Sequence, residues 1–259
     1  MSNFRLVKWY LDASDNEHQA FIGYAATLAW KWIKLHYSGY TFLDSHGKLR
    51  KRNRFSTKAF PDTDSNTIRW KAFDCAGTWQ SSDPPIEEAL LDNGDGKAIR
   101  WQCILPQGDA TVRIGKGGIY SGRGYAEKIE LTIAPWKLPI DELHWGRFLA
   151  EGHTIIWIRW IGAAPKALVY YNGQSIAAPG IAQDKIVFDR YILQLSDAHT
   201  LRKGTVTTTV FARFPALAKL FPKSILQLQE NKWLSAGTLY RGKHVMATGQ
   251  AIHEIVQWK

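Results

Sequence analysis

The feature that most constrains this chain is the alternation of apolar and polar residues in short runs along its whole length. Runs such as "FRLVKWYL" (4–11) and "HTIIWIRWI" (153–161) follow the period of a β-strand and are separated by turn-forming residues. Further runs of this kind are "FIGYAATLAWKWIKLHY" (21–37), "TIRWKAF" (67–73), "AIRWQCIL" (98–105), "KALVYY" (166–171), "KIVFDRYILQL" (185–195), "TVTTTVFARF" (205–214), "GTLYRG" (237–242) and "QAIHEIVQW" (250–258). Many short strands in succession are typical of a sandwich or barrel.

Turn and helix signals refine this picture. Asn172-Gly173 stands between two of the strand-like runs and predicts a tight β-hairpin. The run "PALAKLF" (215–221) predicts one short helix, because Pro215 suits its first position and Pro222 follows its end. The fold class predicted is therefore all-β, with one short helix.

A break in the strand pattern divides the chain into two parts of similar length. In "APWKLPIDEL" (134–143) two prolines and a polar turn interrupt the alternation. Each part is long enough for a small antiparallel barrel. We expect an N-terminal barrel over residues 1–134 and a C-terminal barrel over residues 135–259.

Tryptophan content and positive charge are the unusual features of the composition. The 259 residues include 12 tryptophans, which fill large spaces and flank apolar ligands. The formal net charge is +10, which favours anionic partners such as nucleic acid or membrane headgroups. Part of it lies in "GKLRKRNR" (47–54), where cations are also typical of an exposed strand edge. No nucleic-acid motif accompanies this run, and peripheral contact with an anionic membrane would use Lys48, Arg50, Lys51, Arg52 and Arg54.

The sequence gives little sign of an oxidising compartment or of membrane insertion. The two cysteines, Cys75 and Cys103, lie far apart without metal-type spacing, and whether they pair stays open. The N-terminus has no apolar core of signal-peptide length, and no run is long enough to span a membrane. We expect a cytoplasmic protein.

Several kinds of cofactor and metal chemistry lack their motifs. "GDATVRIGKGG" (108–118) resembles a phosphate loop, but six residues separate its first glycine from Gly115-Lys116 and a glycine follows the lysine. "HEIVQ" (253–257) lacks the second histidine of a zinc-protease helix, and no Gly-x-Ser-x-Gly elbow is present. The eight histidines show no ligand spacing. We expect no metal and no cofactor.

Polar residues interrupt the apolar alternation at three places. In "YAEKIELTI" (125–133), Glu127 shares a strand face with Tyr125 and Ile129. In "HWGRF" (144–148), His144 and Arg147 adjoin aromatic residues. In the last run, the two strand faces carry His253 and Glu254 respectively.

Each of these places has a structural and a functional interpretation. The structural one is a rim position or a buried ion pair, for which Arg147 with Glu127 is a natural pair. The functional one is an acid whose pKa burial raises, so that it stays protonated near neutrality. Such an acid can protonate an electron-rich C=C bond while aromatic rings stabilise the cation that forms. The candidate rings are Tyr125, Trp145, Trp157, Trp160 and Trp233.

These same segments resemble a known family. "GRGYAEKIELTIAPWKLPIDELHWGRF" (122–148), "HTIIWIRW" (153–160) and the C-terminal segments "KWLSAGTL" and "AIHEIVQW" are similar to a bacterial group related to the carotenoid 1,2-hydratases (hydroxyneurosporene synthases) and AttH-like proteins. The resemblance implies two tandem lipocalin-like β-barrels and hydration of an isoprenoid C=C bond without a cofactor, by an acid within the barrel. The Gly-x-Trp in "CAGTW" (75–79) also resembles an element of lipocalin-like barrels. The acid here is Glu instead of Asp.

Three functions follow from these observations. The first is acid-catalysed hydration, isomerisation or cyclisation of an apolar isoprenoid-like substrate, with Glu127 as proton donor and His144 or Arg147 setting its protonation. Substrate contacts would come from the five candidate rings together with His253 and Glu254. The second is a non-catalytic carrier of a lipid, pigment or other hydrophobic ligand, with Arg147 binding an anionic head group. The third is a basic surface that binds membrane or nucleic acid.

Overall fold

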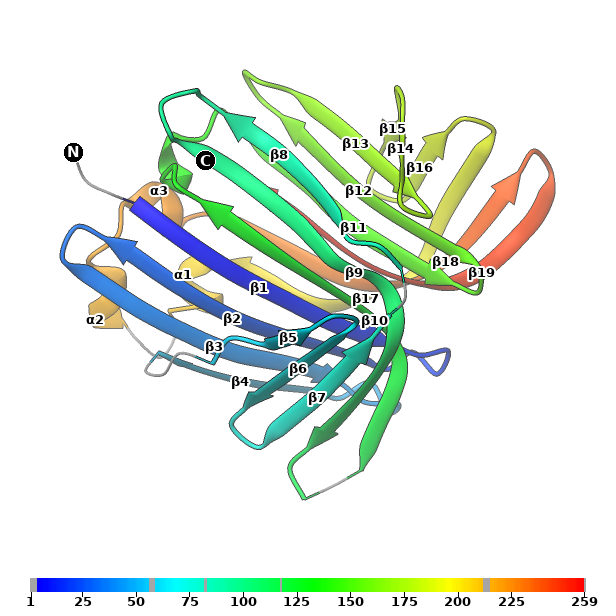
Figure 1. Cartoon of the computed structure of the whole chain (residues 1–259), viewed down its shortest axis with the longest axis horizontal. Coiled ribbons are helices and arrows are strands. Elements are labelled where there is room, and N and C mark those ends of the chain that lie inside the picture. The colour runs from blue at the N-terminus through cyan, green and yellow to red at the C-terminus, as the bar shows by residue number, and fades with distance from the viewer. Residues whose placement is uncertain (1–3, 56–58, 82, 117, 212–214, 259) are drawn as a thin grey trace. The chain divides into compact units, whose positions relative to one another are not determined.

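The computed structural model describes residues 4–55, 59–81, 83–116, 118–211 and 215–258. Strands make up nearly all of its regular structure, which confirms the predicted all-β class. The chain forms two compact units, residues 1–134 and 135–259, and each contains one antiparallel sheet that curls on itself (Figure 1). None of the helices in the described ranges has the length and apolar character needed to cross a membrane.

The first unit contains a sheet of ten strands among the described residues. These are β1 (Phe4–Ser14), β2 (Ala20–Trp30), β3 (Ile33–Leu43), β4 (Leu49–Phe55), β5 (Asp62–Asp64), β6 (Thr67–Ala72), β7 (Cys75–Gln80), β8 (Ile86–Asp92), β9 (Ala98–Ile114) and β10 (Ile119–Leu131). Their spatial order is β4-β3-β2-β1-β10-β9-β7-β6-β5, and β8 pairs separately with β9.

The second unit contains a nine-stranded sheet, again counted over the residues that the structure describes. Its strands are β11 (Glu142–Ala150), β12 (His153–Ile161), β13 (Lys166–Tyr171), β14 (Gln174–Ile176), β15 (Gly180–Ile181), β16 (Lys185–Phe188), β17 (Tyr191–Thr205), β18 (Gln229–Arg241) and β19 (His244–Gln257). Their order is β14-β13-β12-β11-β19-β18-β17-β16-β15.

The two sheets have the same topology once β8 is set aside. In each unit the first strand pairs with the last one, β1 with β10 and β11 with β19. The next three strands extend the sheet on one side as a meander, and the remaining strands extend it on the other. The two units therefore share one strand topology, although the sequence shows no clear internal repeat.

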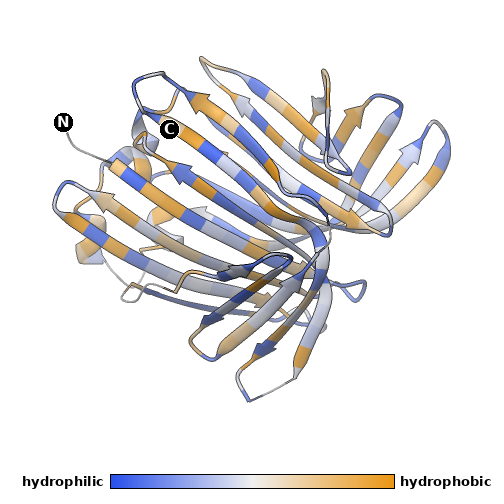
Figure 2. Cartoon of the chain, viewed as in Figure 1, coloured by the Kyte–Doolittle hydropathy of each residue, from blue (hydrophilic) through white to orange (hydrophobic). Residues whose placement is uncertain are grey.

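Alternation along the strands decides which side chains form each core. Strand β6 buries Ile68, Trp70 and Ala72 and exposes Arg69 and Lys71 between them. Figure 2 shows this banding of apolar and polar residues along many of the strands. The core cluster of the first unit includes Leu11, Phe21, Tyr40, Trp70, Trp79, Leu105, Val112 and Ala126. That of the second unit includes Phe148, Ile155, Trp157, Val169, Ile186, Leu193, Leu239 and Ala251.

The tryptophan of the "CAGTW" segment has a structural role in the first core. Trp79 has no exposed surface, and its indole Nε1 donates a hydrogen bond of 2.7 Å to the carbonyl oxygen of Asp12 on β1. A buried indole N–H needs such a partner. The hydrogen bond ties β7 to β1 across the curled sheet.

The hairpin prediction is confirmed, whereas the helix prediction is correct only at its start. Asn172 and Gly173 both have positive φ, 48° and 79°, and join β13 to β14. Helix α2 (Pro215–Ala218) begins at the predicted proline but ends earlier than predicted. The described residues also form two other short helices, α1 (Val206–Thr209) and α3 (Lys223–Leu226), and a 3-10 turn η1 at Pro135–Lys137.

The strand predicted over 205–214 is wrong from residue 206 to residue 209, where the chain forms α1. The hydroxyl of Thr205 accepts a hydrogen bond from the Thr208 backbone N–H, and the Thr208 hydroxyl accepts one from the Thr205 N–H. This reciprocal capping box starts a helix in spite of the β-branched residues that follow. Residues 212–214 of the predicted strand lie outside the described part.

The basic run lies on β4, which is an edge strand of the first sheet. Arg50 forms an ion pair with Asp44 at 3.6 Å, and Arg52 forms one with Asp74 at 2.9 Å. Charged side chains on an edge strand discourage pairing with other chains. Part of the positive charge of this run is therefore balanced within the first unit.

Candidate functional site

The predicted site residues are distributed over both units and, in the second unit, over both faces of the sheet. Tyr125 and Glu127 lie on β10 of the first unit. Four residues lie on the core face of the second sheet, namely His144, Trp157, Trp233 and His253. Four lie on its opposite face, namely Trp145, Arg147, Trp160 and Glu254. The candidate rings Trp145, Trp157 and Trp160 therefore do not share one sheet face, because Trp157 faces the core.

Glu127 is buried, with 9% of its surface exposed, and the contacts of its carboxylate include hydrogen bonds from two neutral donors. The indole Nε1 of Trp101 on β9 donates to Oε2 at 2.6 Å, and the hydroxyl of Tyr125 donates to the same oxygen at 2.7 Å. Tyr125 reaches Glu127 because residues two apart on a strand share a face. The carboxyl group is therefore oriented by both its own strand and the neighbouring one.

The face that carries Glu127 is aromatic and lies opposite the core cluster of the first unit. Glu127 is directly opposite Tyr10 on β1, and Tyr10 is opposite Tyr24 on β2. The ring of Tyr10 lies 5.5 Å from that of Tyr24 and 6.1 Å from that of Tyr125, both edge-on. Core residues such as Leu11 alternate with these and point the other way. Glu127 therefore lies on the sheet face that does not carry the core cluster.

The surroundings of Glu127 keep its neighbours protonated. Burial raises the pKa of Tyr125 well above its ordinary value, and the charges of Cys103 and Glu127 add to this effect. Burial likewise raises the pKa of the Cys103 thiol well above its ordinary value, and the charge of Glu127 raises it further. Tyr125 therefore stays a phenol that can donate its proton in a hydrogen bond.

Trp101 and Cys103 are members of this cluster that sequence reasoning missed. Both lie on β9, where Cys103 is paired with Glu127 and Trp101 with Ile129. A signal was present, because "AIRWQCIL" alternates and places Trp101 and Cys103 on one face. What the alternation could not show is that this face adjoins Glu127.

On the core face of the second sheet, His253 is enclosed by aromatic rings. Its ring stacks on Trp233 with centroids 5.2 Å apart, and its Nε2 lies 2.9 Å from the hydroxyl of Ser235. Burial first, and then the nearby His144, lower its pKa to about 4, and Glu254 opposes part of this shift. His253 is therefore neutral near pH 7.

Packing in the core of the second unit explains why the tripeptide His144-Trp145-Gly146 ends in a glycine. A Cβ on Gly146 would lie 2.1 Å from Cζ2 of Trp157 and 2.8 Å from the Cβ of His253. Only glycine leaves room on β11 for the Trp157 ring and the His253 Cβ. The glycine in this element is thus required by the core of the second unit.

His144 has a different partner from the one that we expected. Its Nε2 lies 2.5 Å from Oε1 of Glu142, and Gln257 donates to the other oxygen of Glu142 at 2.8 Å. Although burial opposes it, these hydrogen bonds hold the pKa of Glu142 below its ordinary value. Glu142 is thus an ionised partner that orients the His144 ring.

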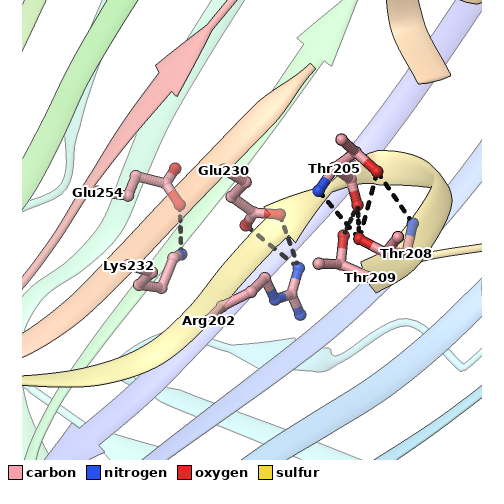
Figure 3. Close-up of polar contacts among 7 residues, drawn as sticks. All are labelled: Arg202, Thr205, Thr208, Thr209, Glu230, Lys232 and Glu254. Atoms are coloured by element: carbon pink, nitrogen blue, oxygen red, sulfur yellow. Dashed lines mark hydrogen bonds and ion pairs between the residues drawn. The ribbon is translucent and has the colours of Figure 1, made fainter. Parts of the chain in front are cut away.

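The opposite face of the second sheet carries a buried lysine that sequence reasoning missed. Lys232 is 1% exposed, and its Nζ lies 2.7 Å from Oε2 of Glu254 on the neighbouring strand (Figure 3). The same Nζ lies 5.4 Å from the centre of the Trp145 ring. Trp145, Glu254 and Lys232 are consecutive across three paired strands, which explains how they meet. Alternation in "ENKWLSAG" placed Lys232 with Leu234 and was the available signal.

Two arginines of the second sheet, Arg147 and Arg202, also make polar contacts. Arg147 has no exposed surface, and its Nη1 donates to the carbonyl oxygen of Gln250 at 2.9 Å. Arg202 donates to both carboxylate oxygens of Glu230, at 3.2 and 3.1 Å (Figure 3). Paired charges of this kind are often structural, because removing one partner leaves the other buried and uncompensated.

The described residues hold no group of three or more His, Cys, Asp and Glu side chains that could bind a metal ion. Cys75 and Cys103 are free and buried, which answers the question of whether they pair. Burial raises the pKa of Cys75 to about 12, and the charge of Asp74 adds to this. Neither thiol has the lowered pKa of a reactive cysteine.

The fold and the buried groups together define a class of protein, a tandem of two lipocalin-like half-barrels. Among solved structures, the chain is similar to a protein assigned as AttH from Nitrosomonas europaea, with a TM-score of 0.64 and 11% identity, covering 99% of this chain and 93% of that one. It is also similar to kievitone hydratase from Nectria haematococca, with a TM-score of 0.58 and 7% identity, covering 97% and 88% of the two chains.

A third similar structure is CghA in complex with Sch210972, with a TM-score of 0.57 and 9% identity, covering 99% of this chain and 89% of that one. No family model matches the sequence. No curated protein matches it either. At these identities the likeness establishes the shared fold, and the chemistry has to be argued from the residues of this chain.

Proposed function

We propose that this chain is a cofactor-independent enzyme that transfers a proton from Glu127 to an electron-rich C=C bond of an apolar, isoprenoid-like substrate. The observation that carries the proposal is the buried carboxyl group of Glu127, whose Oε2 accepts hydrogen bonds from Trp101 and Tyr125 on an aromatic sheet face. The similar fold of an enzyme named a hydratase supports an addition of water as the overall reaction.

The two hydrogen bonds indicate which oxygen would carry the proton. An indole N–H can only donate, so Oε2 is an acceptor whether or not the carboxyl group is ionised. The acidic proton would therefore lie on Oε1. Burial favours this neutral form of the acid before the reaction, because it disfavours charge.

The same two donors favour the transfer itself. As the proton leaves Oε1, negative charge develops on the carboxylate, and Trp101 and Tyr125 already point at it. Donors that are oriented in advance stabilise such charge without reorganisation. Burial and hydrogen bonding thus act at different stages of one proton transfer.

The electron balance requires no cofactor. The π electrons of the C=C bond form the new C–H bond, and the neighbouring carbon becomes a cation that aromatic faces stabilise. Tyr10, Tyr24 and Tyr125 supply rings on the same sheet face. Water then adds to the cation and returns its proton to Glu127, which gives an alcohol and restores the acid.

The test is turnover of acyclic isoprenoid olefins in D2O, with olefin binding measured in parallel. The wild-type protein should place one solvent deuterium on the carbon that receives the proton. Glu127→Gln should lower turnover by about 10²-fold or more, the range of general acid catalysis, with olefin binding retained. Trp101→Phe, which removes one donor, should lower turnover by about 10²-fold.

The matched control is Glu130→Gln. Glu130 lies on the same strand but pairs with Arg5 at the surface, so turnover should be unchanged. If Glu127→Gln turns over as fast as wild type, the acid has been assigned to the wrong residue. If olefins are bound but none is converted by the wild-type protein, the chain is a carrier of hydrophobic ligands and the enzymatic proposal fails.

A further inference from the structure

An open groove of about 520 Å³ lies on the first unit, away from Glu127. It is lined by residues of β5, β6, β7, β9 and β10 together with Phe60. Grooves of this size are within the range that holds small molecules. Its lining combines several cations with two threonine hydroxyls and apolar residues that include Phe60 and Ile119.

Strand register explains why a groove forms here. On β6, Arg69 and Lys71 are exposed neighbours on one face. Across the sheet, Arg69 is paired with Thr78 of β7 and Lys71 with Ala76, and these residues are small. On the next strand, β9, the long side chain of Arg113 forms the second wall of the groove, and Arg113 is paired with Ala76. The two walls stand about 10 Å apart, two strand spacings, over a floor of short side chains.

The charges on the walls are not balanced by ion pairs. Within the described ranges of the chain, the side chains of Arg69, Lys71 and Arg113 make no hydrogen bond, ion pair or ring contact. Asp62 is paired with Arg69 across β5 and β6 yet forms no ion pair with it. Other basic residues of this unit, such as Arg52, do have carboxylate partners. Three cations and one carboxylate leave the groove with a net charge of +2.

We propose that this groove binds the phosphate group of a small amphiphilic phosphate monoester. A phosphate monoester carries nearly two negative charges at neutral pH and presents three acceptor oxygens, which matches the charge and the several donors of the walls. The two arginines stand on opposite walls and can each present a planar fork to phosphate oxygens. The hydroxyls of Thr78 and Thr111 add donors on the floor.

The apolar part of the ligand would lie at one end of the groove. Ile119 is 70% exposed although it is a large aliphatic residue, and it is paired with Arg113 on the neighbouring strand. Phe60 is half-buried and lines the same groove. An alkyl chain attached to the phosphate would cover Ile119, which gains free energy as apolar surface leaves water. This second site does not depend on the function proposed for Glu127.

The test uses hexyl phosphate as the probe, with binding to the full chain measured by calorimetry at low ionic strength. The double variant Arg69→Gln/Arg113→Gln should weaken binding at least tenfold, because the loss of one hydrogen bond to a charged group already weakens binding by about tenfold. Inorganic phosphate should bind several-fold more weakly than hexyl phosphate, and Ile119→Ser should remove that difference. Affinity should fall with added salt, since the groove is open to solvent.

The matched control is Arg100→Gln, an exposed arginine on β9 outside the groove that pairs with Asp92, and it should bind hexyl phosphate like wild type. Far-UV circular dichroism of each variant verifies folding. Equal affinity of wild type and the double variant would overturn the proposal, as would equal affinity for hexanoate and hexyl phosphate. Binding to phosphatidic acid vesicles without any binding of hexyl phosphate would also overturn it, in favour of a membrane contact.

Discussion

Acid should destabilise the second unit through one side chain, His253. Its pKa in the folded chain is lowered from 6.5 to about 4, first by burial and then by His144. The unfolded chain therefore binds a proton at a pH where the folded chain does not. Stability rises with pH wherever the unfolded state binds more protons, so it is lost as pH falls from about 6.5 towards about 4.

The size of the effect follows from the two pKa values. The full difference of about 2.5 pKa units corresponds to about 3 kcal/mol, at roughly 1.4 kcal/mol per unit. At about pH 5 the unfolded imidazole is mostly protonated and the folded one is not, which gives about 2 kcal/mol. Near pH 7 the contribution is small, because the imidazole is then mostly neutral in both states.

The perturbation is His253→Gln, which keeps a polar group beside Ser235 but cannot take up a proton in this pH range. The substitution also removes the stacking on Trp233, and that cost does not depend on pH. The informative quantity is therefore the change between about pH 7 and pH 5, where wild type should lose about 2 kcal/mol relative to the variant.

The assay is urea unfolding followed by far-UV circular dichroism at both pH values, together with amide hydrogen exchange of peptides from β18 and β19. The exchange data are needed because two units need not unfold in one transition. His144→Gln serves as a second variant, since His144 contributes to the lowered pKa of His253. If wild type and His253→Gln lose equal stability between the two pH values, the burial argument is refuted.

Three further predictions test the packing and the buried groups. Gly146→Ala should destabilise the second unit by about 3 kcal/mol or more through its clash with Trp157, seen as a lower urea midpoint; an unchanged midpoint would contradict the geometry. Cys75 and Cys103 should resist a thiol reagent at about pH 8 in the folded protein and react after unfolding, because burial raises the pKa of both thiols; rapid labelling of the native protein would contradict this. Lys232→Met should lower the free energy of unfolding by about 3–5 kcal/mol, because the buried carboxylate of Glu254 then lacks its cation. The double variant Lys232→Met/Glu254→Met should regain most of this stability, and no regain would refute the pairing.

Local patterns in the sequence were sufficient for the strands and for the character of their faces. Period-two alternation predicted that Glu127 shares a face with Tyr125, and the hydrogen bond between them follows from that neighbourhood. Asn172-Gly173 predicted its hairpin because only residues tolerant of positive φ suit that turn. The strand prediction failed at Val206, where the hydrogen bonds of a capping box outweighed β-propensity.

Only the tertiary structure decided which faces meet. The sequence suggested Glu127 as the partner of His144, whereas strand pairing and burial give it Glu142. Trp101 became a donor to Glu127 because β9 pairs with β10 in one particular register. Alternation specifies the two faces of a strand from residues close in sequence, but register is set by packing between strands far apart in the chain. The sequence by itself therefore determined that Glu127 shares a strand face with Tyr125, and the folded sheet determined that it is buried and which donors it meets.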